Sequence, residues 1–155
     1  MMKNLIRIAF LASFVLLLGV MANAQSVSGS IAGGKIARGK AGKATVTLSI
    51  PAGLHVNSNR PNSEYAIATR VSASAAGAKV GAVSYPRGSN RKFAFSEAPL
   101  NVYEGRVAFT FNVTVPATFR GNSLRVNVTV RYQACTNEVC YAPKSKQVTL
   151  TATVN

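Results

Sequence analysis

The residues best suited to chemistry are two cysteines, Cys135 and Cys140, which lie in the stretch RYQACTNEVCYAP with four residues between them. They are the only cysteines in the chain. Two thiols this close can bind a metal, close a structural disulfide, or form a disulfide that exchanges with other thiols. A zinc site needs four ligands and His55 is the only histidine, so we expect no metal here.

The residues around the pair do not decide between a structural and an exchanging disulfide. A bridge that closes so short a loop adds roughly 2 kcal/mol to stability, at the low end for disulfides. Arg131 and Lys144 would stabilise a thiolate, whereas Glu138 would oppose it. The pair is not a Cys-x-x-Cys motif at a helix start, so it is not a thioredoxin-type site. A pair on strands suits a carrier that exchanges electrons with a dedicated partner, but the two roles remain equally supported.

Large aromatic residues could shield such a disulfide from stray oxidants. Residues 87–99 have no clear period but carry two phenylalanines. Tyr132 is in phase with the apolar residues of its strand pattern and is expected in the core. We predict that four aromatic residues cover the cysteines: Phe93, Phe95, Tyr103 and Tyr141.

The chain begins with the pattern of an export signal. Lys3 and Arg7 precede an apolar run over residues 8–20, and Ala22-Asn23-Ala24 is a small-x-small cleavage site. We predict a signal peptide over residues 1–24 that is cleaved after Ala24. No second apolar run follows, so we expect the exported chain to have no membrane span.

The exported chain is strongly basic. Removing Lys3 and Arg7 leaves 16 basic and 4 acidic residues, a net charge of +12. An exported protein rarely meets nucleic acid, so we expect no nucleic-acid partner. The charge favours either an ordinary solvated surface or contact with acidic partners and anionic envelope surfaces. The cations are scattered, and their longest run is Arg91-Lys92.

Strict alternation of apolar and polar residues predicts half-buried strands at residues 43–50, 107–115, 124–132 and 147–154. Shorter strands are expected at residues 54–56, 67–74, 79–85 and 102–103, between Gly and Pro turns. Residues 25–42 are rich in Gly, Ser and Lys and are expected to be a flexible lead-in, with one short edge strand at residues 28–31.

About seven to nine short strands without a helical period predict an all-β domain over residues 43–155. An immunoglobulin-like antiparallel β-sandwich is the most economical form at this size. The usual disulfide between the two sheets of such domains is absent, because Cys135 and Cys140 are too close in sequence to join two sheets.

The segments YQAC and CYAP, at residues 132–135 and 140–143, resemble the active-site segment of the periplasmic N-terminal domain of the disulfide reductase DsbD. The similarity extends to PAGLHV at residues 51–56, to Tyr85-Pro86 and to VYEG at residues 102–105. It covers about residues 43–154.

The resemblance implies an immunoglobulin-like fold, periplasmic localisation and a reversible disulfide between Cys135 and Cys140, without a cofactor. Such a domain takes electrons from a thioredoxin-like domain and passes them to periplasmic thiol-disulfide proteins. By the resemblance, Cys140 forms the mixed disulfide with partners and Cys135 resolves it. A cap loop would correspond to residues 91–100, with Phe93 or Phe95 as the shield.

The chain departs from that family in the cysteine spacing, which is one residue shorter than in its best-known member, and in a basic cap loop whose only acid is Glu97. The transmembrane and thioredoxin-like parts of DsbD are also missing. We therefore expect a monomeric module that works as a protein-disulfide reductase component only with a separate electron donor. The alternative is a non-enzymatic sandwich that binds an envelope partner and keeps Cys135–Cys140 as a structural disulfide.

Overall fold

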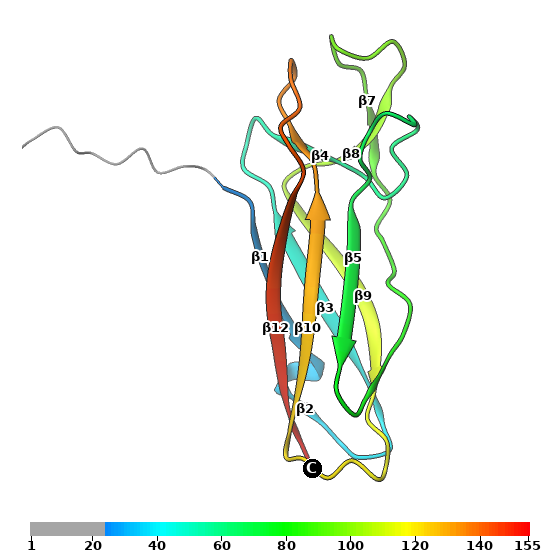
Figure 1. The fold of residues 1–155 in the computed structure, drawn as a ribbon, viewed down its shortest axis with the longest axis vertical. Helices are drawn as coiled ribbons and strands as arrows, with labels where there is room; N and C mark the ends of the chain where they lie inside the picture. Colours follow the sequence, from blue (N-terminus) through cyan, green and yellow to red (C-terminus); the bar gives the residue numbers. More distant parts are fainter. Residues whose placement is uncertain (1–23) are drawn as a thin grey trace, which may run out of the picture.

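The computed structural model describes residues 24–155. They form an elongated β-structure in which two four-stranded sheets run along the molecule and a third lies at one end (Figure 1). Except for Ala24, the predicted signal peptide lies outside the described residues. Within residues 24–155, no helix has the length and apolar character needed to cross a membrane.

The first long sheet has the strand order β1 (Ser26–Ile31), β3 (Ala41–Ser49), β9 (Arg106–Thr114) and β6 (Lys79–Val80), and all of its pairs are antiparallel. Every second residue of β3 and β9 is buried, because successive side chains of a strand point to opposite faces. The strands predicted at residues 43–50 and 107–115 are therefore confirmed.

The second long sheet has the order β2 (Lys35–Ile36), β12 (Lys144–Val154), β10 (Ser123–Tyr132) and β5 (Arg70–Ala75). β10 pairs antiparallel with both β12 and β5, whereas the short β2 runs parallel to β12. The sheet therefore departs from the predicted antiparallel arrangement at this edge alone.

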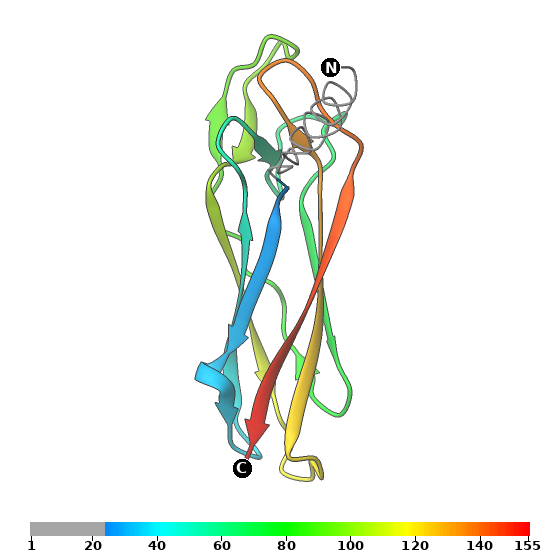
Figure 2. The same ribbon diagram turned by 90° about the vertical axis from the view of Figure 1, so that its left-hand side faces the viewer.

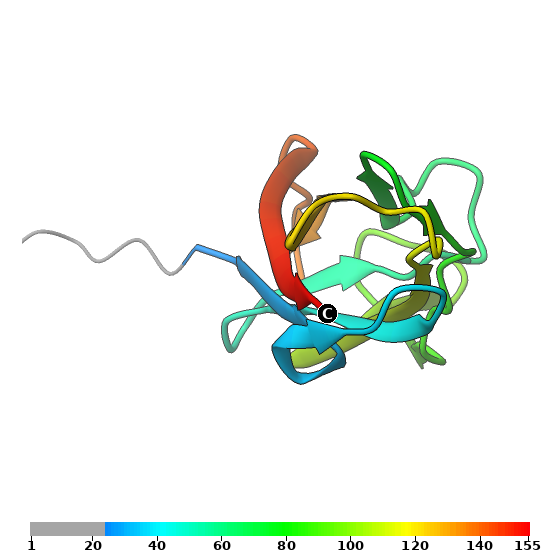
Figure 3. The same cartoon turned by 90° about the horizontal axis from the view of Figure 1, so that it is seen from below.

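The two long sheets enclose one main core, which Figure 3 shows end-on. The predicted immunoglobulin-like β-sandwich is confirmed. Residues 24–155 contain twelve strands, rather than about seven to nine. The three that were not expected, at Lys35–Ile36, Ser89–Arg91 and Ala134–Cys135, have only two or three residues, too few for a period to be recognised. The largest fully buried side chains include Tyr132, Phe109, Ile31 and Leu48.

The third sheet has the order β11 (Ala134–Cys135), β4 (His55–Asn57), β8 (Leu100–Tyr103) and β7 (Ser89–Arg91), with antiparallel pairs throughout. It lies at the end of the molecule opposite the C-terminus (Figures 1 and 2). This end carries the cysteine loop and the loop between β7 and β8, so the third sheet positions the residues with the chemistry.

Residues 25–42 differ from the expected flexible lead-in. They form β1, the 3-10 turn η1 (Ala32–Gly34) and β2, and they place Ile31 and Ile36 in the core. Because these residues are rich in glycine, their sequence does not indicate that they contribute to the core. A Cβ at Gly29 would lie only 2.4 Å from the Thr45 carbonyl oxygen, so glycine is what allows β1 to approach β3 this closely.

The strand predicted at residues 79–85 is shorter than expected. Only Lys79–Val80 form β6, and Ser84 makes a single bridge to Thr110. Pro86 follows immediately and cannot donate a backbone hydrogen bond, which limits how far the pairing can extend.

Candidate functional site

Cys135 and Cys140 are joined by a disulfide, with an S–S distance of 2.05 Å and Cα atoms 4.0 Å apart. The four residues between them form a tight turn in which the Thr136 N–H donates to the Val139 carbonyl oxygen at 2.8 Å. The Thr136 hydroxyl oxygen accepts from the N–H groups of Glu138 and Val139, each at 3.1 Å. The cysteine loop, residues 135–140, is therefore ordered by its own backbone hydrogen bonds as well as by the disulfide.

The two cysteines differ sharply in their exposure to solvent. Cys135 lies in β11 and is 0% exposed, whereas Cys140 lies beyond the turn and is an exposed residue. A thiolate exchanges with a disulfide by attacking one of its sulfur atoms, and the rate depends on access to that atom. An incoming thiolate can therefore reach the disulfide through Cys140.

His55 shares a row with the two cysteines. Cys135 pairs with His55 of β4 on one side and bridges to Cys140 on the other, and both pairings are antiparallel. Directly opposed residues of antiparallel strands project from the same face, with Cβ atoms about 4.5–5.5 Å apart. The imidazole is 2% exposed, and this burial lowers its pKa, against a smaller opposing effect of the Glu104 carboxylate.

The loop between β7 and β8, residues 92–99, covers this row with a stack of aromatic rings. Phe93 stacks on His55 with ring centroids 4.0 Å apart, and Phe95 stacks on Phe93 at 5.3 Å. Phe93 is 7% exposed, so it is a packed side chain, while Phe95 remains 40% exposed at the edge of the stack. These rings shield the His55 end of the row and leave one aromatic edge open to a partner.

Polar contacts hold this loop at its two ends. The Arg91 guanidinium donates two hydrogen bonds to the Glu104 carboxylate, at 2.8 and 3.0 Å. The Lys92 ammonium donates to the carbonyl oxygens of Ser96 and Glu97. Both contacts are exposed, so they contribute about 1 kcal/mol or less each and mainly define the path of the loop.

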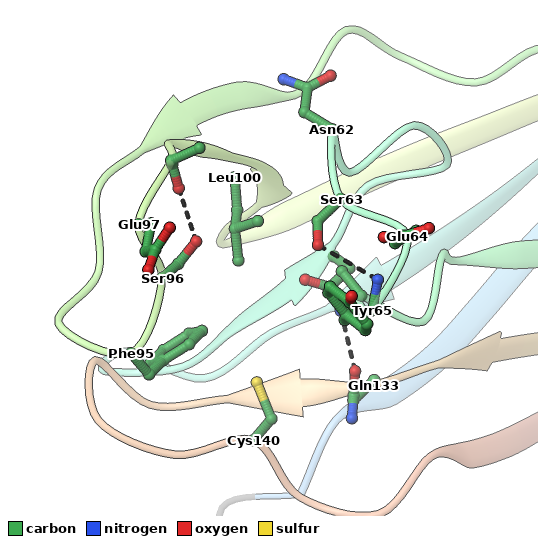
Figure 4. A pocket seen from close by; sticks show the side chains of 13 residues that line it. Asn62, Ser63, Glu64, Tyr65, Phe95, Ser96, Glu97, Leu100, Gln133 and Cys140 are labelled. Atoms are coloured by element: carbon green, nitrogen blue, oxygen red, sulfur yellow. Dashed lines mark hydrogen bonds between the residues drawn. The ribbon is translucent and has the colours of Figure 1, made fainter.

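A cavity of about 650 Å³ opens beside Cys140. The Cys140 sulfur points into the space between Phe95 and Tyr65 (Figure 4). Gln133 supports this wall, because its side-chain oxygen accepts from Asn57 Nδ2 at 3.0 Å and from the Ile67 N–H at 3.3 Å. Its amide nitrogen donates to the Tyr141 carbonyl oxygen at 3.2 Å, so Gln133 links three of the segments at the cavity, but not residues 95–100.

Exposed large apolar side chains of residues 24–155 occur only around the disulfide. Tyr65 and Phe95 line the cavity with Cys140, and Val139 and Tyr141 flank Cys140 in the sequence. Tyr65 is 88% exposed, an unusual state for a large aromatic ring without a partner. Exposed apolar residues that gather at one place mark a binding surface.

The match to a family model identifies this arrangement. The model for the N-terminal region of the thiol:disulfide interchange protein DsbD matches residues 28–152. The chain belongs to the DsbD N-terminal family. The resemblance inferred from the YQAC and CYAP segments is thus confirmed.

Two solved structures show the same fold as this DsbD N-terminal family member. The reduced N-terminal domain of Neisseria meningitidis DsbD matches with a TM-score of 0.50 and 16% identity, over 82% of this chain and 85% of that one. The N-terminal periplasmic domain of ScsB from Proteus mirabilis matches with a TM-score of 0.53 and 15% identity, over 81% of this chain and 45% of the ScsB chain. None of the curated protein sequences matches this chain.

The residues predicted to cover the disulfide divide into three groups. Phe93 and Phe95 form the aromatic stack, and Tyr141 follows Cys140 and is 49% exposed. Tyr103 differs from the expectation, because it is 4% exposed in the main core and its hydroxyl lies 2.7 Å from Asn59 Oδ1. Burial raises its pKa, so this phenol stays neutral and holds a neighbouring loop.

Sequence reasoning missed part of the site. The sequence suggests His55 only as a possible metal ligand, and it gives no separate signal for the cavity residues Asn57, Tyr65 and Gln133. Tyr65 lies in a loop with no period, but Gln133 stands in the YQAC segment, two residues before a cysteine, where a role at the site could have been inferred. Among residues 24–155, no group of three or more His, Cys, Asp or Glu side chains could hold a metal ion.

Proposed function

We propose that this protein is a periplasmic thiol-disulfide exchange module whose Cys135–Cys140 pair relays electrons between a thioredoxin-like partner and client proteins. The observation that carries the proposal is the position of Cys140. The residue is exposed, its sulfur points into the cavity (Figure 4), and the large exposed apolar side chains of residues 24–155 lie around it, while Cys135 is fully buried. A disulfide that served only as a staple would not require a binding surface centred on one of its sulfur atoms.

The exchange proceeds in two balanced steps. A thiolate of the reduced partner attacks Cys140 Sγ, and the sulfur of Cys135 leaves with the bonding electron pair. The partner's second thiolate then attacks the sulfur of the partner's first cysteine in the mixed disulfide and releases Cys140 as a thiolate. The partner becomes a disulfide, this chain becomes a dithiol, and the same steps in reverse pass two electrons to a client disulfide.

The apolar rim around Cys140 gives the partner a place to dock. Tyr65, Phe95, Val139 and Tyr141 supply the apolar contact, and Asn57 and Gln133 lie behind the cavity. A partner that carries an exposed thiol on an apolar surface, as a thioredoxin-like protein does, fits such a rim. Phe93 and Phe95 would limit the access of small oxidants to the buried part of the site.

The periplasmic assignment rests on the predicted signal peptide and on the family. Lys3 and Arg7 precede an apolar run and a small-x-small site, and the ScsB structure that shares its fold is described as a periplasmic domain. In that compartment a disulfide can persist, and under this proposal a reduced thioredoxin-like partner supplies the electrons. Under this proposal the chain acts as one component of a protein-disulfide reductase and as a monomer.

The proposal predicts that a reduced thioredoxin-like protein converts the purified exported chain to its dithiol form. The expected result is that one Cys135–Cys140 disulfide is reduced for each disulfide formed in the partner. Alkylation of the free thiols followed by mass spectrometry measures both. A control reaction with the partner's attacking cysteine replaced by serine should leave the disulfide intact. If the complete partner also leaves Cys135–Cys140 oxidised, the chain is instead a binding protein with a structural disulfide.

A further inference from the structure

His55 is buried in an unusual way for a polar side chain. It is 2% exposed, and its Nε2 atom is buried without a hydrogen-bond partner. Most buried polar atoms are paired, because an unpaired one costs about 1–3 kcal/mol. The unpaired atom belongs to a titratable ring next to the disulfide. We therefore look for a role of His55 in the reduced form, where the Cys135 sulfur gains or loses a proton.

The row in the third sheet places His55 against one cysteine only. Cys135 stands between His55 and Cys140, and all three side chains project from the same face because the pairings are directly opposed. Phe93 covers one face of the imidazole with a ring stacked at 4.0 Å. When the disulfide is open, the thiol of buried Cys135 therefore has His55 as its neighbour across the strand pair and little contact with water.

We propose that His55 accepts the proton of the Cys135 thiol when Cys135 closes the disulfide and returns that proton when Cys135 is the leaving group. This inference rests on the proposed exchange function and adds a proton-transfer residue to it. The exposed Cys140 can lose its proton to solvent, whereas the buried Cys135 needs an acceptor inside the protein. His55 is the one titratable side chain in that row besides the cysteines.

After Cys140 has formed a mixed disulfide with a client, the S–H proton of Cys135 moves to His55 Nε2. The Cys135 sulfur then attacks Cys140 Sγ, the bond between Cys140 and the client sulfur breaks, and the client leaves as a thiolate. The imidazolium gives up its proton after the client has left, so the net products are the closed disulfide, the client thiolate and one proton. In the reducing direction the imidazolium gives its proton to Cys135 as that sulfur leaves.

The state of the imidazole suits an acceptor. Desolvation lowers the pKa of His55 below its usual value of about 6.5, so the ring is neutral at pH 7. The charged groups on the segments around it are Arg91, Lys92, Glu104 and Glu138, which line a second cavity together with Phe93. Arg91 pairs with Glu104, so the carboxylate that would favour an imidazolium is largely compensated.

The proposal is tested by separating the two chemical steps. The reduced exported chain is mixed with excess oxidised glutathione, and samples are quenched in acid at set times. Mass spectrometry then quantifies the Cys140–glutathione adduct and the closed disulfide separately. We expect His55→Phe, which keeps a ring against Phe93, to slow closure on the order of 100-fold at pH 7, the range of general base catalysis. The glutathione adduct should accumulate, and the rate at which it forms should be unchanged.

The pH dependence distinguishes proton transfer from a packing defect. In the wild type, closure should be independent of pH above about 6.5 and slow down as the pH falls through the lowered pKa of His55. In His55→Phe, the rate of closure should rise about tenfold per pH unit until the pH reaches the pKa of the Cys135 thiol, which is about 8.5 for an ordinary cysteine. His55→Gln, which is polar but does not titrate in this range, should behave like His55→Phe.

Each other outcome has a definite meaning. If either folded variant closes its disulfide at the wild-type rate and with the wild-type pH profile, His55 has no part in proton transfer. If closure is slow but retains the wild-type pH profile, His55 acts through packing alone and the proposal is wrong. If the reduced wild type forms neither the glutathione adduct nor the closed disulfide, the exchange function itself fails, which is a separate result.

Discussion

Cys135→Ser should form a stable mixed disulfide with a thioredoxin-like partner, whereas Cys140→Ser should form almost none. In the first variant the exposed Cys140 thiolate remains available but no resolving thiol follows. In the second the remaining thiol belongs to Cys135, which is 0% exposed in the folded chain. We expect the adduct to form more than about tenfold faster with Cys135→Ser, since both thiolate access and thiolate fraction favour it.

The adduct is best measured with a defined partner. A thioredoxin-like protein that lacks its resolving cysteine is activated as a mixed disulfide with thionitrobenzoate, and release of the coloured thiolate reports each attack. The double serine variant supplies the background rate. Equal rates for the two single variants, or a faster reaction of Cys140→Ser, would show that Cys140 is not the point of entry.

Phe109→Ala should cost about 3–5 kcal/mol of the free energy of unfolding. Phe109 lies in β9, is 0% exposed, and meets the rings of Tyr85 and Tyr103 edge-on at 5.5 and 6.0 Å. The Tyr85 hydroxyl oxygen accepts from the Val71 N–H at 2.8 Å. Loss of Phe109 therefore leaves a cavity beneath the two tyrosines that support the loops of the disulfide end.

Urea unfolding followed by tyrosine fluorescence measures this loss. Phe109→Leu is the matched control, since it keeps most of the apolar volume and should lose less than about 2 kcal/mol. Globular domains have a total stability of about 5–15 kcal/mol, so the alanine variant should be measurably less stable at room temperature. A loss below about 1 kcal/mol for Phe109→Ala would mean that the core can close around the missing ring.

The sandwich was predictable because its long strands each bury one face. The alternation in β3, β9, β10 and β12 follows directly from the two-residue period of a strand. The full length of β1 was harder to predict than its presence at residues 28–31, since β1 contains Gly29 and small polar residues. Glycine usually argues against a strand interior, but here it permits close approach of the backbone of β3.

The site was only partly predictable, because it is assembled from very short strands. β11 and β4 contain two and three residues, and no sequence period reveals that Cys135 pairs with His55. The two phenylalanines could be assigned to a shielding loop because large aromatic residues in an irregular segment need a packing partner. Residue type alone does not distinguish Tyr103 from these shielding residues. Its position in the core follows from the register between β4 and β8.

The most direct test of the exchange function is the reduction potential of the Cys135–Cys140 disulfide. The exported chain is equilibrated in buffers of reduced and oxidised dithiothreitol or glutathione, and the two forms are separated after alkylation. We expect a potential less negative than about −300 mV, at which a reduced thioredoxin-like protein can open the bond. A potential below about −300 mV would identify a structural disulfide and contradict the proposed relay.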